Sequence, residues 1–300
     1  MKIALFGNEF PSNYIKYINH LITKLESENV ELIIHHKFHD FLQDSINFSE
    51  ETKTFERITS EENIDFLFSI GGDGTLLKAV TYVRESNIPI LGINQGRLGF
   101  LTDLHPVNLT EQLKGILQGQ YILDERFLLE LSIRDVSGNL VVTEQVINDV
   151  VIHSGDKLKL MDFELYVDDR FVYQQRADGL ILATPTGSTA YALSAGGSIV
   201  DTKINAINIV PICPHNLSSR PMMVDGDSAV MVNIMRSHSD TYQPLVSCDG
   251  KTQFNIEHGY QLSIHKSSNS LLLVHLPDYD YYQICRSKLS WSRKLGKSVY

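Results

Sequence analysis

The chain has 300 residues, 43% of them hydrophobic, and its formal net charge at neutral pH is −10. A chain of this length is expected to form two domains. The negative charge argues against a general nucleic-acid binder and against a protein held on anionic lipid by basic residues. It does not exclude a phosphate ligand, because backbone amides and a few basic side chains can bind phosphate within an acidic protein.

Targeting and membrane-spanning features are not apparent in the sequence. The first apolar stretch, Lys2–Gly7, is too short for the apolar region of a signal peptide. No apolar run approaches the roughly 20 residues that a membrane span requires. The three cysteines are widely spaced and match neither a disulfide framework nor a paired metal site. We therefore expect a soluble, cytoplasmic protein that does not bind membranes.

The first third of the chain alternates between strand and helix patterns. Continuous apolar runs are typical of buried parallel strands, and apolar residues at a spacing of three and four indicate amphipathic helices. Residues 40–63 are polar and have no clear periodicity. The predicted strands are Lys2–Gly7, Val30–Ile34, Ile64–Ile70 and Pro89–Ile93, and helical patterns follow Ser12, Gly74 and Asn108. This alternation predicts an α/β domain with a parallel sheet over residues 1–126.

The periodicity changes at about residue 127. Leu129, Leu131 and Ile133 alternate with polar residues, which is the two-residue period of a half-buried strand. A β-rich domain is therefore predicted over residues 127–283, with residues 189–197 as its best helix candidate. Further strand-like runs are residues 140–146, 161–167, 170–175, 179–183, 206–210, 228–234, 261–265 and 271–275.

The most specific local feature is the segment GGDGT, residues 71–75, between a predicted buried strand and a predicted helix. Glycines let the backbone approach a ligand closely, and a helix N-terminus favours phosphate. Asp73 would repel phosphate, so its presence suggests that it receives a proton from an attacking hydroxyl or helps to hold a metal ion. A tight structural turn would explain the glycines alone. The pattern is neither the Walker A motif nor GxGxxG.

Three further segments are polar or glycine-rich at strand ends. Residues 92–100 (GINQGRLGF) follow a buried strand, so this loop and GGDGT are expected to flank one crevice. Residues 184–191 (TPTGSTAY) offer hydroxyls and amides that could bind ribose or phosphate, although a structural turn has the same composition. Asn148-Asp149 interrupts an apolar run, where polar residues either end a strand or face a ligand.

Together these segments resemble the NAD kinase family, in family order and over most of the chain. GGDG alone is shared with phosphofructokinases and with diacylglycerol and sphingosine kinases, whereas PTGSTAY and the Asn-Glu/Asp pair are more specific. Here that pair is Asn148-Asp149, with Asp in place of Glu. The matching segments are GGDGT, INQGRLGFLTD, Asn148-Asp149, RADGLILATPTGSTAYALSAGG, Pro211–His215 and Lys288–Ser292.

The resemblance implies an NAD kinase, which transfers the γ-phosphoryl group of ATP to the 2′-hydroxyl of the adenosine ribose of NAD. Asp73 would accept the proton of that hydroxyl and contribute mainly by orienting it, because the transition state is loose. Gly74 would lie against the dinucleotide, and Asn148 and Asp149 would hold its ribose and adenine. Other implied binding positions are Lys78, Lys159, Arg176, Asp178, Thr189, Ala190, Tyr191, Ala192, Leu193 and Ser194.

Family members pair an α/β domain with a β domain, and their last residues, about 284–300 here, return to the first domain. The resemblance also implies a homo-oligomer, commonly a tetramer, and a divalent cation. No carboxylate or histidine cluster is evident, so this ion, expected to be Mg²⁺, would be carried by the ATP phosphates. The residues leave open whether polyphosphate replaces ATP and whether NADH is accepted.

Two other functions are compatible with parts of this pattern. A lipid kinase would share GGDG but needs a membrane-facing apolar or basic surface, and a dinucleotide sensor would bind NAD without turnover. The intact Asp73 argues against the sensor.

His35, His36 and His39 are the only histidine cluster in the sequence. We expect them in a solvated loop, because no Cys or carboxylate lies at a standard zinc-ligand spacing.

Overall fold

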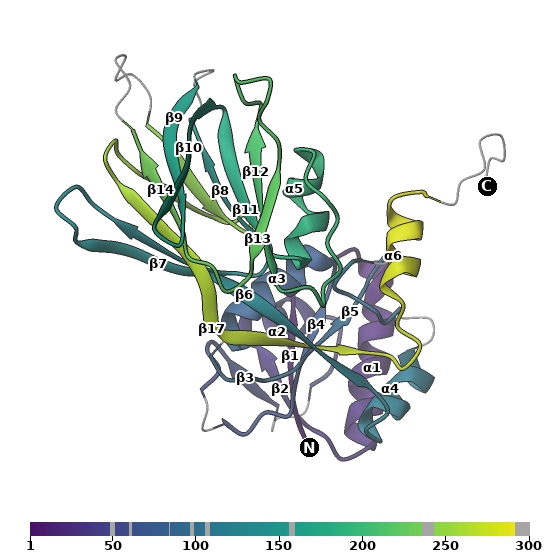
Figure 1. The fold of residues 1–300 in the computed structure, drawn as a ribbon. Coiled ribbons are helices and arrows are strands. Elements are labelled where there is room, and N and C mark those ends of the chain that lie inside the picture. Colours follow the sequence, from purple (N-terminus) through teal and green to yellow (C-terminus); the bar gives the residue numbers. More distant parts are fainter. Residues whose placement is uncertain are drawn as a thin grey trace. The chain divides into compact units, whose positions relative to one another are not determined.

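The computed structural model describes residues 1–48, 52–59, 62–83, 85–96, 99–105, 109–155, 160–235 and 243–291 (Figure 1). It divides into two compact units. Unit 1 comprises Met1–Glu125 together with Leu271–Tyr300, and unit 2 comprises Arg126–Ser270. The sequence placed the return of the chain to the first unit at about residue 284, whereas residues from Leu271 onward cluster with unit 1. The unit boundaries fall at or within two long strands, β6 (Ile122–Arg134) and β17 (Gln261–His275).

Unit 1 contains a parallel sheet with the strand order β3-β2-β1-β4-β5. On its far side, β5 pairs in parallel with the C-terminal part of β17, where Leu273 lies opposite Ile90. The predicted parallel sheet is therefore confirmed, and the strand that completes it comes from the other end of the chain. The five strands are β1 (Lys2–Gly7), β2 (Glu31–His35), β3 (Lys53–Phe55), β4 (Phe66–Ile70) and β5 (Ile90–Ile93).

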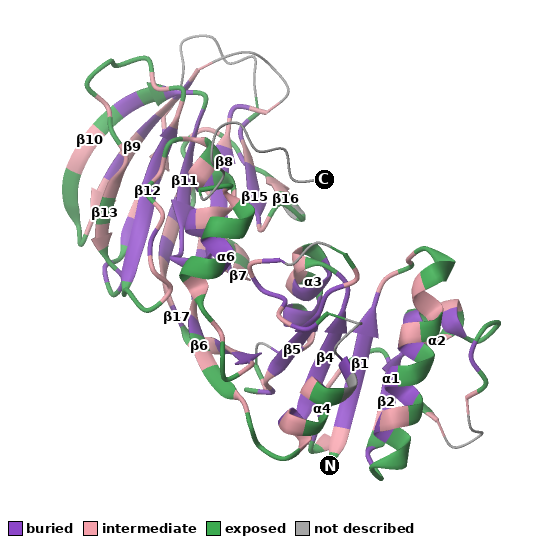
Figure 2. Ribbon diagram, turned by 90° about the vertical axis from the view of Figure 1, so that its right-hand side faces the viewer, coloured by how far each residue is buried: buried purple, intermediate pink, exposed green. Residues whose placement is uncertain are grey.

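The helices of unit 1 form where apolar residues recur at helical spacing. In α1 (Ile15–Ser27), residues Ile18, Leu21, Ile22 and Leu25 are buried and the intervening residues are mostly exposed (Figure 2). This face packs with β1 and β4 in one hydrophobic cluster. The other helices are α2 (His36–Leu42), α3 (Asp73–Val83), α4 (Leu109–Leu117) and α6 (Tyr281–Lys288).

The expectation of a solvated loop at the three histidines is wrong. His35 ends β2 and is 5% exposed, and α2 begins at His36. The His35 ring packs edge-on against Phe6 and Phe55, and its Nε2 lies 2.9 Å from the Tyr82 hydroxyl. Because both segments are short and rich in polar residues, neither this helix nor the short strand β3 was predicted from the sequence.

Unit 2 is built from two sheets of mostly antiparallel strands. One sheet has the order β13-β12-β11-β8-β15-β16, and the other contains β10, β9, β14, β17, β6 and β7. The strands named here for the first time are β7 (Leu140–Val146), β8 (Asp149–His153), β9 (Met161–Val167), β10 (Arg170–Ala177), β11 (Gly179–Ala183), β12 (Ala206–Ile212), β13 (Met222–Asp225), β14 (Val230–Ile234), β15 (Leu245–Cys248) and β16 (Thr252–Asn255).

The inner faces of these two sheets form one hydrophobic core. Alternate residues such as Leu129, Leu131 and Ile133 of β6 point into it together with Phe163 and Leu182. The two-residue period read from the sequence therefore marks the buried face of this unit. Strand β11 is buried along its whole length, because the opposite face of its sheet is covered by the short helix α5 (Tyr191–Ser194) (Figure 2).

Several strands of unit 2 differ from the sequence prediction. The segments 261–265 and 271–275 form a single 15-residue strand, β17, because the polar residues between them remain extended in a strand that pairs with β6. Strands β8, β13, β15 and β16 were not assigned from the sequence. Among the described residues, no helix is long and apolar enough to cross a bilayer.

Candidate active site

The GGDGT segment forms the connection from β4 to α3, and Asp73 is the first residue of that helix. Its side chain is half-buried. Asp73 Oδ2 accepts a hydrogen bond from the Phe100 amide at 2.8 Å, and Oδ1 accepts one from the Leu101 amide at 3.1 Å. The two glycine-rich loops therefore meet at the carboxyl edge of the sheet, as expected from the sequence. The second loop fixes the orientation of the Asp73 carboxylate.

Gly99 lies so close to Asp73 that any side chain at this position would displace the Asp73 carboxylate. A Cβ atom on Gly99 would be 1.8 Å from Asp73 Oδ1. The Gly99 amide donates to Thr102 Oγ1 at 3.1 Å, and the buried Asn94 side chain donates to the same oxygen at 3.2 Å. Residues 99–102 thus form a compact turn around the Asp73 carboxylate.

The backbone at the start of α3 is open. Gly72 and Gly74 are exposed, and a Cβ atom on either would meet no atom within 4 Å. Lys78 is exposed one turn further along the helix. Free amides and the positive end of the helix dipole make such a helix start favourable for phosphate.

The helix start lies at the point where the strand order reverses. Strands β1 and β4 are neighbours, with β2 on one side and β5 on the other, which is the position where open α/β sheets bind ligands. Asn8 follows β1 directly, and its Nδ2 donates to Thr75 Oγ1 at 3.0 Å. The sequence analysis did not single out Asn8, although a polar residue directly after a buried strand is the signal that could have found it.

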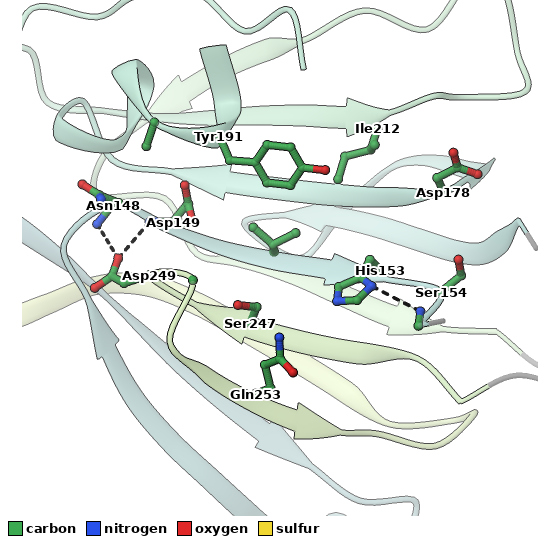
Figure 3. A pocket seen from close by; sticks show the side chains of 14 residues that line it. Asn148, Asp149, His153, Ser154, Asp178, Tyr191, Ile212, Ser247, Asp249 and Gln253 are labelled. Carbon is green, nitrogen blue, oxygen red and sulfur yellow. Dashed lines mark hydrogen bonds between the residues drawn. The ribbon is translucent and has the colours of Figure 1, made fainter. Parts of the chain in front are cut away.

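Unit 2 contains a pocket of about 610 Å³ over the outer face of the β8 sheet (Figure 3). Its polar side chains come from both ends of β8, from the β10–β11 turn, from the start of α5, and from β15, β16 and the turn between them. The lining residues are Asn148, Asp149, Val151, His153, Ser154, Gly155, Asp178, Ala190, Tyr191, Ile212, Ser247, Asp249, Gly250 and Gln253.

Asp249 holds the turn that carries Asn148 and Asp149. Its carboxylate accepts hydrogen bonds from the amides of Asn148 at 2.7 Å and Asp149 at 3.3 Å (Figure 3). It also accepts one from the Ile147 amide at 3.0 Å. The sequence analysis missed this residue. Asp249 and Gly250 both have positive φ, of 49° and 65°, so the Asp-Gly pair between two apolar runs was a hairpin signal that could have found it.

The carboxyl group of Asp149 is buried in this pocket beside Asp249. Burial, and then repulsion from Asp249, raise the pKa of Asp149 to about 7, while the Tyr191 amide opposes the shift. Burial also raises the pKa of Asp249, against the lowering effect of its three amide donors. At neutral pH a large fraction of Asp149 is therefore protonated and can donate a hydrogen bond as well as accept one.

The TPTGSTAY turn packs directly on the turn that carries Asn148. A Cβ atom on Gly187 would be 2.0 Å from the Asn148 carbonyl oxygen. The Thr184 amide donates to that oxygen at 2.9 Å, and the Thr184 hydroxyl donates to the Ile147 carbonyl at 2.5 Å. Two motifs that are about 40 residues apart in the sequence thus form one structural element.

The other residues singled out from the sequence have varied positions. Asp178, Ala190 and Tyr191 line the pocket with Asn148 and Asp149. Five others do not line it. Arg176 forms an ion pair with Asp162 on the neighbouring strand, with 3.0 Å between Nε and Oδ1, and the Thr189 hydroxyl donates to the Thr186 carbonyl. Ala192 lies in a hydrophobic cluster, Leu193 is half-buried and Ser194 is exposed. Lys159 lies outside the described residues. Asp73, Gly74 and Lys78 belong to unit 1.

Two family models match the chain. The model of the ATP-NAD kinase N-terminal domain matches residues 14–121, and that of the ATP-NAD kinase C-terminal domain matches residues 147–276. The first match includes GGDGT and the loop that holds Asp73. The second includes most residues that line the pocket of unit 2.

Curated relatives and solved structures agree with these matches. The chain is 46% identical to the NAD kinase of Ectopseudomonas mendocina over 81% of its own length and 82% of the relative's. It is 45% identical to the NAD kinase of Pseudomonas fluorescens strain SBW25 over 81% of each chain. A solved NAD kinase from Archaeoglobus fulgidus in complex with ATP is 26% identical, with a TM-score of 0.71 over 97% of this chain and 99% of that one. Yeast NADH kinase complexed with NADH shares the fold, with a TM-score of 0.88 at 24% identity over 99% of this chain and 90% of that one.

Proposed function

The chain belongs to the ATP-NAD kinase family, and on that premise we propose that it transfers the γ-phosphoryl group of ATP to the 2′-hydroxyl of the adenosine ribose of NAD. The products are NADP and ADP. The observation that carries this proposal is the carboxylate of Asp73, fixed by two amides at the start of a helix that favours phosphate.

Asp73 orients the attacking hydroxyl and accepts its proton. Each carboxylate oxygen accepts one amide hydrogen bond, and each retains a lone pair for a further donor. Phosphoryl transfer passes through a loose transition state, in which the proton leaves late. Alignment of the hydroxyl is therefore the larger part of the contribution of Asp73, and the two amides make that alignment rigid.

The triphosphate of ATP lies over the first turn of α3. Gly72 and Gly74 leave the backbone there open to a ligand, and the amides at the helix start can donate to phosphate oxygens. Lys78, on the same helix, is a further phosphate contact.

A divalent cation, Mg²⁺, accompanies the ATP phosphates. Within the described parts of the chain, no group of three or more His, Cys, Asp or Glu side chains is arranged to hold a metal ion. A cation coordinated chiefly by phosphate oxygens and water fits this donor set, as is usual for Mg²⁺. When bound, it offsets the charge of the transferring group.

The pocket of unit 2 binds the adenosine part of NAD. Asn148 offers both a donor and an acceptor, and partly protonated Asp149 can do the same, which suits ribose hydroxyls and adenine nitrogens. Tyr191 and Ile212 supply apolar surface for the base. Arg176, Thr189, Ala192, Leu193, Ser194 and Lys159 remain proposed binding positions on the family resemblance alone.

The assembly and compartment are also proposed from the family. We infer a homotetramer that works in the cytoplasm. None of the three cysteines, all of which lie in described parts of the chain, forms a disulfide bond, which suits a reducing compartment.

The proposal is tested by incubating the purified protein with NAD and Mg·ATP and measuring NADP with a dehydrogenase specific for it. The Asp73→Asn variant keeps the shape of the side chain but not its basicity, so we expect kcat to fall about 100-fold or more while NAD still binds. The Asp44→Asn variant, at an exposed carboxylate of unit 1, is the matched control. NAD binding without NADP formation by the wild type would instead indicate a dinucleotide sensor, and phosphorylation of lipid but not NAD would indicate a lipid kinase.

A further inference from the structure

A buried histidine near the end of β17 lies between two carboxylates of unit 1. His275 is 1% exposed, and its Nδ1 is 2.7 Å from Asp103 Oδ2. Its Nε2 is 3.3 Å from Asp124 Oδ2. The ring also stacks on Tyr279, with 3.7 Å between the ring centroids and 13° between the planes. The hydrogen bond with Asp103 and the stacked Tyr279 ring fix the imidazole at one edge and on one face, and its other edge faces Asp124.

Asp103 belongs to the same loop that holds Asp73. Phe100 and Leu101, whose amides donate to the Asp73 carboxylate, lie two and three residues before it. After Asp103 the backbone is anchored on β5, because the amides of Asp103 and Leu104 donate to the Gly92 carbonyl at 3.2 Å. The loop is thus fixed at its end by backbone bonds, by the hydrogen bond from the Asn94 side chain to Thr102, and by the contact of Asp103 with His275.

We propose that His275 is a positioning residue for Asp73, acting through Asp103 and residues 99–102. The inference rests on the proposed role of Asp73 in phosphoryl transfer. None of the sequence features placed His275 in the site, and it reaches the loop from a segment 172 residues further along the chain.

The physical reason is the burial of Asp103. Its side chain is only 7% exposed, and a buried carboxylate that loses its partner is strongly destabilised. The loop can relieve this by moving Asp103 towards water. Since Phe100 and Leu101 lie on the same short turn, that movement displaces the two amides that orient Asp73. A displacement of about 1 Å at a reacting group can lower a rate about 100-fold.

If His275 only stabilises the fold, replacing it by Asn or by Gln should lower kcat equally. If it positions Asp73 through Asp103, the two variants should differ. The amide nitrogen of Asn can take the place of Nδ1, whereas that of Gln can take the place of Nε2. His275→Asn therefore retains a donor for Asp103, and His275→Gln retains one only for Asp124. Both variants lose the stacked ring on Tyr279 and are matched in that respect.

Steady-state kinetics with NAD and Mg·ATP give the first readout. We expect kcat of His275→Gln to fall about tenfold or more while its KM for NAD changes less than about threefold. His275→Asn is expected to recover most of the turnover. Equal values of kcat in the two variants, or a larger loss in His275→Asn, would overturn the proposal.

Hydrogen exchange gives a second readout that does not depend on activity. In His275→Gln, peptides containing Phe100 and Leu101 should exchange faster than in the wild type, and those in His275→Asn should not. Exchange in α1 should be the same in both variants. Unchanged exchange at Phe100 and Leu101 in His275→Gln would contradict the positioning role. If the exchange differs as expected but the wild type forms no NADP, the proposed function fails and the loop contact stands.

A further pair of variants covers the case in which both His275 variants fail to fold. Asp103→Asn removes the charge on the loop side of the imidazole, and Asp124→Asn removes it on the other side. We expect faster exchange at Phe100 and Leu101, and the larger loss of kcat, in Asp103→Asn. The reverse order, or equal effects, would overturn the proposal.

Discussion

Asp149 and Asp249 belong to two different turns, but their carboxyl groups lie beside each other in the pocket of unit 2, and each has a different role there. Asp249 accepts three backbone amides and so remains well supported as a hydrogen-bond acceptor. The hydrogen bond from the Tyr191 amide lowers the pKa of Asp149, but burial and the nearby Asp249 outweigh it and raise this pKa to about 7. The environment thus separates the two groups into an acceptor that holds the turn and a carboxyl that can donate to a ligand.

The raised pKa of Asp149 predicts how stability depends on pH. The native state binds this proton more tightly than the unfolded chain, whose Asp has a pKa of about 3.8. The contribution of Asp149 is therefore greatest below about pH 4 and is lost as the pH rises to about 7 and above. We expect the free energy of unfolding of the wild type to fall more steeply between pH 5 and pH 8 than that of Asp149→Asn, by a few kcal/mol. Urea titrations of both proteins at pH 5 and pH 8 measure this difference. An equal change in the free energy of unfolding for the wild type and Asp149→Asn would contradict the prediction.

At the scale of the element, α3 begins with residues that do little for its stability. Gly74 lies in the first turn of α3, where Ala would be the better helix former. A Cβ atom at this position would meet no protein atom within 4 Å. Packing within the described part of unit 1 therefore does not explain why this residue is glycine. Space for a bound phosphate does explain it.

Gly74→Ala separates stability from ligand binding. We expect the variant to be more stable by up to about 1 kcal/mol, because Ala favours the helix, and its KM for ATP to rise about tenfold, because the methyl group occupies the phosphate position. Thermal unfolding and steady-state kinetics measure the two effects. Gly115→Ala, at another helical glycine in α4, is the control and should raise stability without changing the KM for ATP. An unchanged KM for ATP in Gly74→Ala would place the phosphates elsewhere.

Elements with a strong period could be predicted from the sequence, and elements that depend on distant partners could not. The helix α1 and the strands β1, β4 and β9 follow directly from apolar spacing. Strand β3 and helix α2 are short and polar, and they are stabilised by packing of Phe55, Phe38 and Leu42 that no local pattern reveals. The sequence singled out Asp73, Asn148 and Asp149, whose roles as site residues stay predictions. It missed Asn8, Asp249 and His275, because each acts through a residue more than 60 positions away.

At the scale of the whole molecule, two separate hydrophobic cores share one strand. Val274 of β17 packs in the core of unit 1, whereas Ile264 of the same strand packs in the core of unit 2. Residues that are ten positions apart on β17 therefore stabilise different parts of the protein.

This division predicts that two substitutions on β17 have different local effects. Val274→Ala should speed hydrogen exchange in β1 and β4, and Ile264→Ala, which costs about 2–5 kcal/mol, should speed it in β11 and β12. The reason is that each truncation leaves a cavity in only one core. Exchange mass spectrometry on both variants tests this. Equal acceleration in both sets of strands would show that the units unfold together.

The proposed mechanism requires the Asp73 carboxylate to contact the adenosine ribose of NAD. The most direct test is a crystal structure of the protein with NAD bound. We predict that the 2′-hydroxyl of the adenosine ribose lies within hydrogen-bond distance of the Asp73 carboxylate, about 2.6–3.2 Å, with Asn148 and Asp149 on the adenosine. A complex in which another group of the dinucleotide faces Asp73, and the 2′-hydroxyl contacts neither of its oxygens, would contradict the proposed mechanism.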